Sequence, residues 1–131
     1  MNWSYVEPGF ITEKVLAGRP VLLTVESFTE TDTDAAQAYA DEIWNWLVAN
    51  RSHIDDIAPA IVSLKNAHWL EVNEEPATLE GILPQLQNVA AVYAQQNEGV
   101  LIYYDVGEMF AGNSVVIMLS PEFQFRGIQI M

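Results

Sequence analysis

Two carboxylates that flank an irregular segment near the end of the chain are the residues best placed to do chemistry. Asp105 and Glu108 belong to the stretch Asp-Val-Gly-Glu-Met-Phe-Ala-Gly-Asn at residues 105–113, here called the 105–113 loop. Paired carboxylates carry out acid–base chemistry where burial separates their pKa values. A turn accounts for them more simply, because Asp105 can end a strand and bond the following backbone while Glu108 faces water. We therefore predict no catalytic residue here.

Signatures of other chemistries do not occur in the sequence. It contains no cysteine, no Gly-x-Ser-x-Gly nucleophile elbow and no glycine-rich phosphate loop. His68 and Glu71 could share one helix face as two metal ligands, but a metal site needs more ligands than these two. We therefore predict no metal and no other cofactor, and a protein that is not an enzyme.

Aromatic side chains are the remaining candidates for a functional surface. Trp44 and Trp46 cannot both face the core from one straight helix, which places Trp44 at the edge of the apolar stripe. An exposed tryptophan is typical of a protein-binding surface, whereas an edge tryptophan can also cover part of a sheet. Both interpretations of this residue stay open. The residues expected to form a binding surface are Trp44, Trp69, Asp105, Glu108, Phe110 and Asn113.

The 105–113 loop also has a purely structural interpretation. Phe110 can enter the core between sheet and helices, and Gly112 can adopt a backbone conformation that other residues disfavour. Asn113 tolerates a left-handed conformation and can bond nearby backbone. The loop would then be a plug at one end of the sheet. Irregular loops on rigid scaffolds often carry function, however, so a binding role also stays open.

The charge is strongly acidic, with 18 acidic residues against 5 basic ones and a formal net charge of −13. Such a surface repels phosphate backbones and anionic lipids, which disfavours nucleic-acid and membrane binding. It would suit a partner with a basic face, although acidic surfaces also simply keep small proteins soluble. The N-terminus does not resemble a secretory signal, and the absence of cysteine fits a reducing cytoplasm, so we expect a cytoplasmic protein.

Hydrophobic periodicity predicts two helices between groups of strands. Apolar residues recur at helical spacing over residues 34–50 and 54–68, and Pro59 is expected to break or kink the second helix early. A shorter helical segment is expected at residues 78–83. Alternating patterns bounded by turn residues predict strands at residues 10–16, 20–28, 86–95, 100–105, 115–119 and 123–131.

The order of these elements predicts the fold class. At 131 residues the chain is expected to form one domain, residues 1–131. Strands followed by helices and then by more strands indicate an α+β fold. We predict an antiparallel sheet of about six strands with two or three helices packed on one face.

Short motifs in the second half of the chain add a resemblance. Asn66-Ala-His-Trp69 follows the second predicted helix, Tyr103-Tyr-Asp105 ends a strand, and Phe110-Ala-Gly-Asn113 leads into another. This succession resembles a group of small uncharacterised bacterial domains that read Asn-x-x-Trp and Phe-x-Gly-His at these places. Asn113 stands where the group often has histidine, which weakens any role for a histidine there. Some members resemble immunity proteins that neutralise toxins, so the resemblance implies protein binding.

Three hypotheses for function remain. The first is an acidic protein-binding module, immunity-like and directed at a basic partner. The alternative is a small-molecule-binding or hydrolytic domain with a pocket near the 105–113 loop and Trp69. The third is a homo-oligomer in which residues 115–119 and 128–131 pair edge to edge with a second copy.

Overall fold

Seven strands form one sheet whose order follows the chain from β1 to β7. The structure is a computed structural model that describes residues 4–6, 9–26, 28, 31–50 and 52–131. The strands are β1 (Ser4–Val6), β2 (Gly9–Leu16), β3 (Arg19–Glu26), β4 (Val89–Gln95), β5 (Gly99–Tyr104), β6 (Val115–Leu119) and β7 (Phe125–Ile130). With three helices between β3 and β4, this is the predicted α+β class.

The helices of the described residues all lie between the third and fourth strands. They are α1 (Thr33–Ala49), α2 (His53–His68) and the short α3 (Leu79–Ile82), which continues into the 3₁₀ helix η1 (Leu83–Gln87). Both long helices were predicted within one residue at each end. The predicted break at Pro59 is wrong, because α2 runs through this proline without interruption. The strand predicted from residue 86 begins three residues later, because η1 occupies those positions.

The first hairpin shows how local sequence sets strand pairing. Ala17 and Gly18 connect β2 to β3 with positive φ angles of 52° and 79°. Two such residues in succession give the turn whose twist matches a hairpin, and glycine adopts it without a Cβ penalty. Alternate residues of β3 then point inward, and Val21, Leu23 and Val25 are fully buried.

One pair of neighbouring strands differs from the predicted antiparallel sheet. β3 and β4 are parallel, and Leu23 lies beside Val92 in their register. All other neighbours are antiparallel. Antiparallel neighbours need only a short turn, whereas a parallel pair needs a long crossover. The segment that contains the helices provides this crossover.

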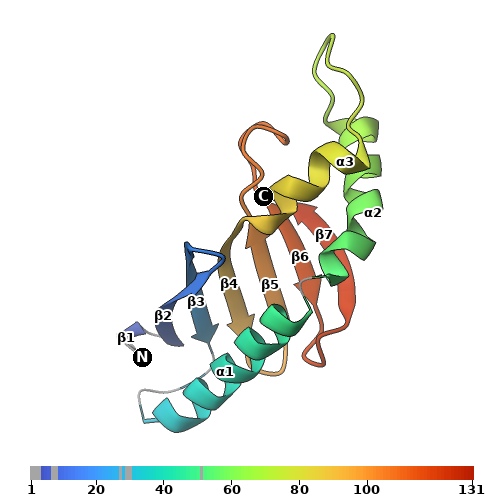
Figure 1. Ribbon diagram of the computed structural model, residues 1–131. Helices are drawn as coiled ribbons and strands as arrows, with labels where there is room; N and C mark the ends of the chain where they lie inside the picture. Colours follow the sequence, from blue (N-terminus) through green and yellow to red (C-terminus); the bar gives the residue numbers. More distant parts are fainter. Residues whose placement is uncertain (1–3, 7–8, 27, 29–30, 51) are drawn as a thin grey trace.

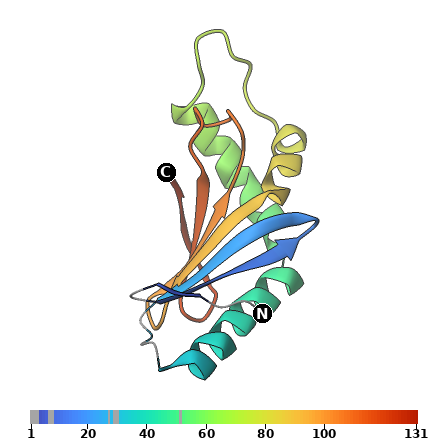
Figure 2. The same ribbon diagram turned by 90° about the vertical axis from the view of Figure 1, so that its left-hand side faces the viewer.

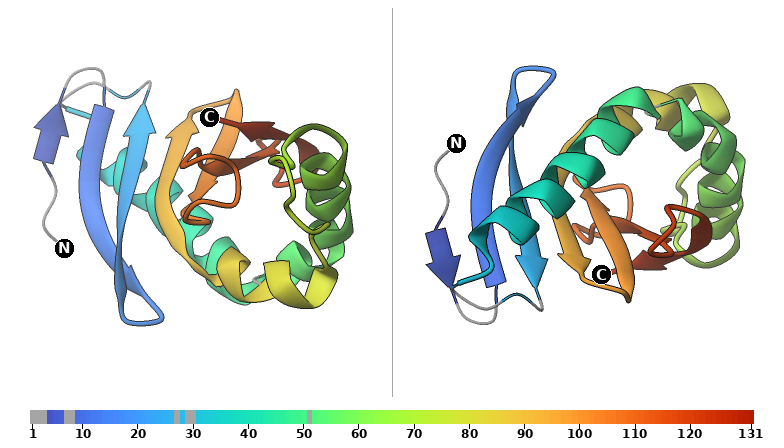
Figure 3. Two further views of the ribbon diagram at one scale, coloured as in Figure 1. Left: turned by 90° about the horizontal axis from the view of Figure 1, so that it is seen from above. Right: turned by 90° about the horizontal axis from the view of Figure 1, so that it is seen from below.

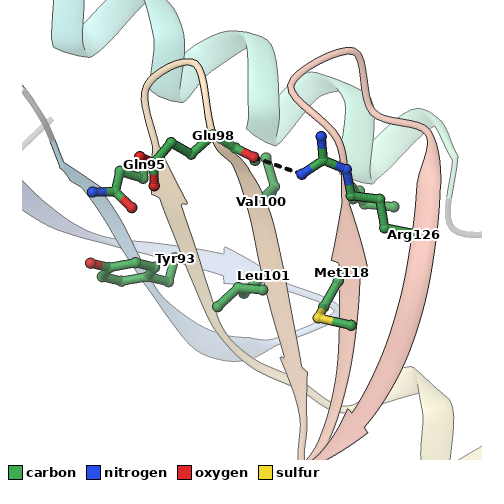
Figure 4. Close-up of a pocket in the computed structure, with 9 residues that line it drawn as sticks. Tyr93, Gln95, Glu98, Val100, Leu101, Met118 and Arg126 are labelled. Carbon is green, nitrogen blue, oxygen red and sulfur yellow. Dashed lines mark hydrogen bonds between the residues drawn. The ribbon is translucent and has the colours of Figure 1, made fainter.

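The helices and one face of the sheet share a single hydrophobic core. Ala40 and Leu47 of α1, Ile61 of α2 and Ile82 of α3 are buried together with the inward residues of β2 to β6. Figure 2 shows α1 along the β2–β3 end of the sheet, and α1 contacts β3. Figure 3 shows β4 to β7 curving toward α2 and α3 at the other end. The opposite face of the sheet carries no helix, as Figure 4 shows for β4 to β7.

Candidate functional site

A cleft lies at the end of the molecule where two irregular segments meet. One is the connection between α2 and α3, which projects beyond the sheet at the top of Figure 1, and the other is the 105–113 loop below it. The cleft has a volume of about 560 Å³ and also reaches α3 and η1. Its polar lining includes Lys65, Glu74, Glu75, Thr78, Gln85 and Glu108.

Lys65 is the buried charged residue around which this cleft is built. Its position four residues after Ile61 places it on the buried face of α2, and only 4% of its surface is exposed. The ammonium donates hydrogen bonds of 2.9 Å to the carbonyl oxygen of Trp69 and to Oε1 of Glu74. It also lies 5.9 Å from the ring centre of Phe110. One lysine therefore joins the end of α2 to both irregular segments.

Glu74 is held in its charged form by its partners. Its carboxylate accepts a hydrogen bond from the backbone N–H of Glu71 and another from Lys65. These two bonds, in that order, lower the pKa of Glu74 below its ordinary value, while partial desolvation acts in the opposite direction. The carboxylate therefore stays ionised beside the lysine, which balances the one buried positive charge of the cleft.

Asn66 fixes the far wall of the cleft. Its side-chain amide donates to the carbonyl oxygen of Ala77 over 3.2 Å, and its side-chain oxygen accepts from the N–H of Ala77 over 2.7 Å. Thr78 then caps α3 by accepting a hydrogen bond from the N–H of Gly81. Asn66 thus ties α2 to the start of α3, which positions the connecting segment over the cleft.

The 105–113 loop contributes backbone turns and one buried ring. The Asp105 carboxylate accepts from the N–H of Gly107, and Asn113 donates from its side chain to the carbonyl of Phe110. Phe110 is fully buried, which agrees with the structural interpretation of the loop, and it meets Trp69 edge to face with ring centres 5.7 Å apart. Gly112 has a φ of 81°, in the region that favours glycine. These contacts support the structural interpretation of the loop.

The predicted site residues do not all converge on the cleft. Glu108 lines it, whereas Asp105, Phe110, Asn113 and Trp69 are not part of its lining. Trp44 lies elsewhere, on α1, where it is partly buried against the core. Its ring centre is 6.0 Å from the Lys14 ammonium on β2. Trp44 therefore follows the second interpretation, an edge residue that covers part of the sheet.

Sequence reasoning missed Lys65 as the organising residue of the cleft. The predicted apolar stripe of this helix consists of Ile54, Ile57, Ile61 and Leu64. The side chain of Ile54 lies outside the part of the chain that the structure describes. In the structure Ala58 and Ile61 are fully buried, whereas Ile57 and Leu64 are only partly buried. Compared with the predicted stripe, the buried face of α2 is shifted by about one residue along the sequence, toward Ala58 and Lys65. The spacing of Ala58, Ile61 and Lys65 was the signal that could have identified it.

A smaller hollow lies on the helix-free face of the sheet (Figure 4). Tyr93, Leu101 and Met118 are neighbours across β4, β5 and β6, and Arg126 donates to the backbone carbonyl of Glu98 above them. A hydrogen bond to Glu26 raises the pKa of Tyr93 to about 12. The hollow measures about 210 Å³, which is below the roughly 300–1,000 Å³ of typical ligand pockets.

The predicted homo-oligomer, in which residues 115–119 and 128–131 pair with a second copy, is wrong for residues 115–119. Residues 115–119 form β6, whose two sides are already paired with β5 and β7. These residues cannot pair with a second copy, because both rows of backbone hydrogen-bonding groups are used. β7 is a terminal strand of the sheet and keeps one row unpaired within it.

Neither a metal site nor a membrane helix is found in the described part of the chain. No group of three or more His, Asp or Glu side chains among those residues is arranged to hold a metal ion. Likewise, none of the described helices combines the length and the apolar character of a membrane span. Comparison of the chain with protein-family models, with curated proteins and with solved structures finds no match.

Proposed function

We propose that this protein is a non-enzymatic binding module that recognises a basic protein partner through the cleft at Lys65. The observation that carries the proposal is the pair Glu75 and Glu108, which line the cleft from two separate segments. Neither carboxylate forms an ion pair with any residue that the structure describes. They are therefore available to a lysine or arginine side chain of a partner.

Charge and size both favour such a guest. The cleft lining carries three carboxylates, on Glu74, Glu75 and Glu108, against one ammonium, on Lys65. Its volume of about 560 Å³ is ample for a long basic side chain. The net charge of −13 would draw a basic partner from a distance, which raises association rates at low salt.

The resemblance to immunity-like domains gives the proposal a class of partner. We propose a basic toxin that the protein neutralises by covering part of its surface. A chain without cysteine needs no oxidising compartment, which suits action in the cytoplasm.

A charge-reversal experiment tests this function. The protein is immobilised and exposed to a lysate of its host at about 0.05 M and about 0.5 M salt, and captured proteins are identified by mass spectrometry. We expect a basic protein to be retained at low salt and released at high salt. The double variant E75K/E108K should lose it, because the cleft would then repel cations.

The matched control is E13K/E122K, which changes the net charge equally at two exposed positions that do not line the cleft. Retention by this control and loss by E75K/E108K would place recognition at the cleft. Equal loss of the captured protein by both variants would show that net charge alone, and not the cleft, determines retention. If no basic protein is retained by the unaltered protein at low salt, the proposal fails.

A second candidate function is small-molecule binding at the same cleft. Its volume falls within the usual range of ligand pockets, and residues 106–109 of the 105–113 loop line it. Hydrolysis has less support. Asp105 does not line the cleft, and one of its carboxylate oxygens is occupied by the Gly107 N–H. Saturation of the cleft by a small molecule, with no protein captured, would favour this candidate.

A further inference from the structure

A second, predominantly apolar pocket lies between the first half of α2 and the strands β5 and β6. Its volume is about 520 Å³. Most of the lining consists of large apolar side chains, chiefly Trp46, Ile57, Ile102, Ile117, Leu119 and Phe123. The cleft at Lys65 belongs to the other end of α2 and shares none of these residues. The pocket is therefore independent of the function proposed above.

The packing of α2 explains why this space is not filled. The helix packs mainly against α3 and η1, and its first half stands over β5 and β6 without closing onto them. The residues of α2 that line the pocket are Asp56, Ile57 and Ala60, and the methyl group of Ala60 fills little volume. On the other side, Trp46 and Phe123 stack with ring centres 5.4 Å apart and planes 15° apart. This stack forms an aromatic wall that fixes the shape of the pocket.

Polar groups are few and belong to the outer part of the pocket. The lining contains one charged side chain, Asp56, and one side-chain amide, Gln124. Both side chains are exposed to solvent. Ile102 and Ile117 at the inner end are each only 1% exposed. An apolar interior with a small number of polar groups is the usual composition of a small-molecule site.

We propose that this pocket binds a small hydrophobic molecule that carries a protonated amino group. The hydrophobic body would lie against the aromatic wall and the isoleucines, where removal of apolar surface from water favours binding. The amino group would lie at Asp56 as a charge-assisted hydrogen bond. An acidic head group would meet both Asp56 and the field of a chain with net charge −13, so anionic amphiphiles are disfavoured.

Three probes with one common body test the proposal: 4-phenylbutylamine, 4-phenylbutanol and 4-phenylbutyrate. Binding is measured by calorimetry and by the shift of the Trp46 indole N–H signal in NMR, which the W46F variant identifies. We expect the amine to bind about tenfold more tightly than the alcohol, or about 1.4 kcal/mol. The carboxylate should bind more weakly than the alcohol.

Two pairs of variants separate the pocket from its head-group site. A60W should fill the pocket and abolish binding of the amine and the alcohol, whereas A67W places the same residue at an exposed position of α2 outside the lining and should leave binding unchanged. D56N should remove the preference for the amine and keep the alcohol bound. D55N is its matched control, because Asp55 is exposed in the same helical turn but does not line the pocket.

Three results would overturn the proposal. Absence of binding by all probes up to millimolar concentration would show that the pocket takes no such ligand. Equal affinity for amine and carboxylate would refute the assignment of a cationic head group. Binding that survives A60W without loss would place the ligand elsewhere on the molecule.

Discussion

Lys65 shows how one buried charge can organise a region that is otherwise irregular. Burial of an ammonium is unfavourable unless its hydrogen bonds are made. Lys65 meets this condition with the Trp69 carbonyl and the Glu74 carboxylate, while Phe110 covers it with its ring. Trp69 and Glu74 belong to the connection between α2 and α3, whereas Phe110 belongs to the 105–113 loop. One side chain therefore contacts both segments.

Replacement of Lys65 by methionine should measure how much these contacts stabilise the fold. K65M keeps the apolar stem but removes the donor, so we expect urea denaturation to show a loss of about 1.5–3 kcal/mol, the range for hydrogen bonds made by charged groups. K14M is the matched control, since Lys14 and Asp41 form a looser ion pair of 3.9 Å. K14M should cost less than about 1 kcal/mol. Equal effects of the two variants would contradict the special role of Lys65.

Glu74 should make stability depend on pH in one direction. Its pKa is lowered in the folded protein, first by the Glu71 N–H and then by Lys65. A lowered carboxylate pKa stabilises the fold above the ordinary value of 4.5, and the benefit disappears as pH falls through the folded value. The difference in unfolding free energy between the unaltered protein and E74Q should be constant from pH 6 to about 5 and shrink below that. A difference that stays constant down to about pH 3 would refute this.

At the scale of elements, Asn66 joins α2 to the connecting segment by two hydrogen bonds, one donated and one accepted. Its side-chain amide pairs with both backbone groups of Ala77. The connecting segment from Glu71 to Pro76 is exposed along its length, so it gains little from burial. Such a segment opens locally more easily than the core unless a specific contact holds it.

Removal of this contact should loosen the connecting segment without unfolding the protein. In N66A the N–H of Ala77 loses its partner, so its hydrogen exchange should accelerate, and proteases should cut between residues 70 and 78. Hydrogen-exchange mass spectrometry and limited proteolysis measure the two effects. S63A, at an exposed position of the same helix, should behave like the unaltered protein. Unchanged exchange at Ala77 in N66A would mean that other contacts hold the segment.

The same scale shows what sequence reasoning can and cannot reach. Strands β2, β3 and β6 were predicted because the pattern within a strand and the turn residues beside it are local properties. The predicted break at Pro59 is wrong because a proline removes one backbone hydrogen bond of a helix, and α2 continues through that loss. The parallel pairing of β3 with β4 depends on which distant strand is the neighbour, and periodicity does not encode that. The cleft at Lys65 was missed for the same reason, since its lining comes from three separate segments.

At the scale of the whole molecule, charge repulsion opposes folding. The formal charge is −13, and only 5 basic residues are available to offset 18 acidic ones. Compaction brings these carboxylates closer together, which destabilises the folded state. Salt reduces this repulsion, because the screening length falls from about 30 Å at 0.01 M to about 10 Å at 0.1 M.

Stability should therefore rise with ionic strength. We expect the urea midpoint at pH 7 to increase when sodium chloride is raised from about 0.01 M to about 0.3 M. Most of the increase should occur in the lower part of this range, where screening changes most. Potassium chloride at equal ionic strength should give the same result, which separates screening from specific ion effects. A midpoint that falls with salt would mean that attractive ion pairs outweigh the repulsion.

The parallel pairing of β3 with β4 has a consequence for how the chain folds. The β2–β3 hairpin and the succession β4 to β7 are each local in sequence and can form quickly. β3 and β4 can pair only after the long segment between Glu26 and Val89 has brought them together. The conformational entropy of closing this loop is therefore lost before any β3–β4 hydrogen bond forms. We infer that docking of these two halves is the slow event of folding. Until it occurs, both β3 and β4 expose an unpaired edge, which is the point at which a newly made chain is most prone to self-association.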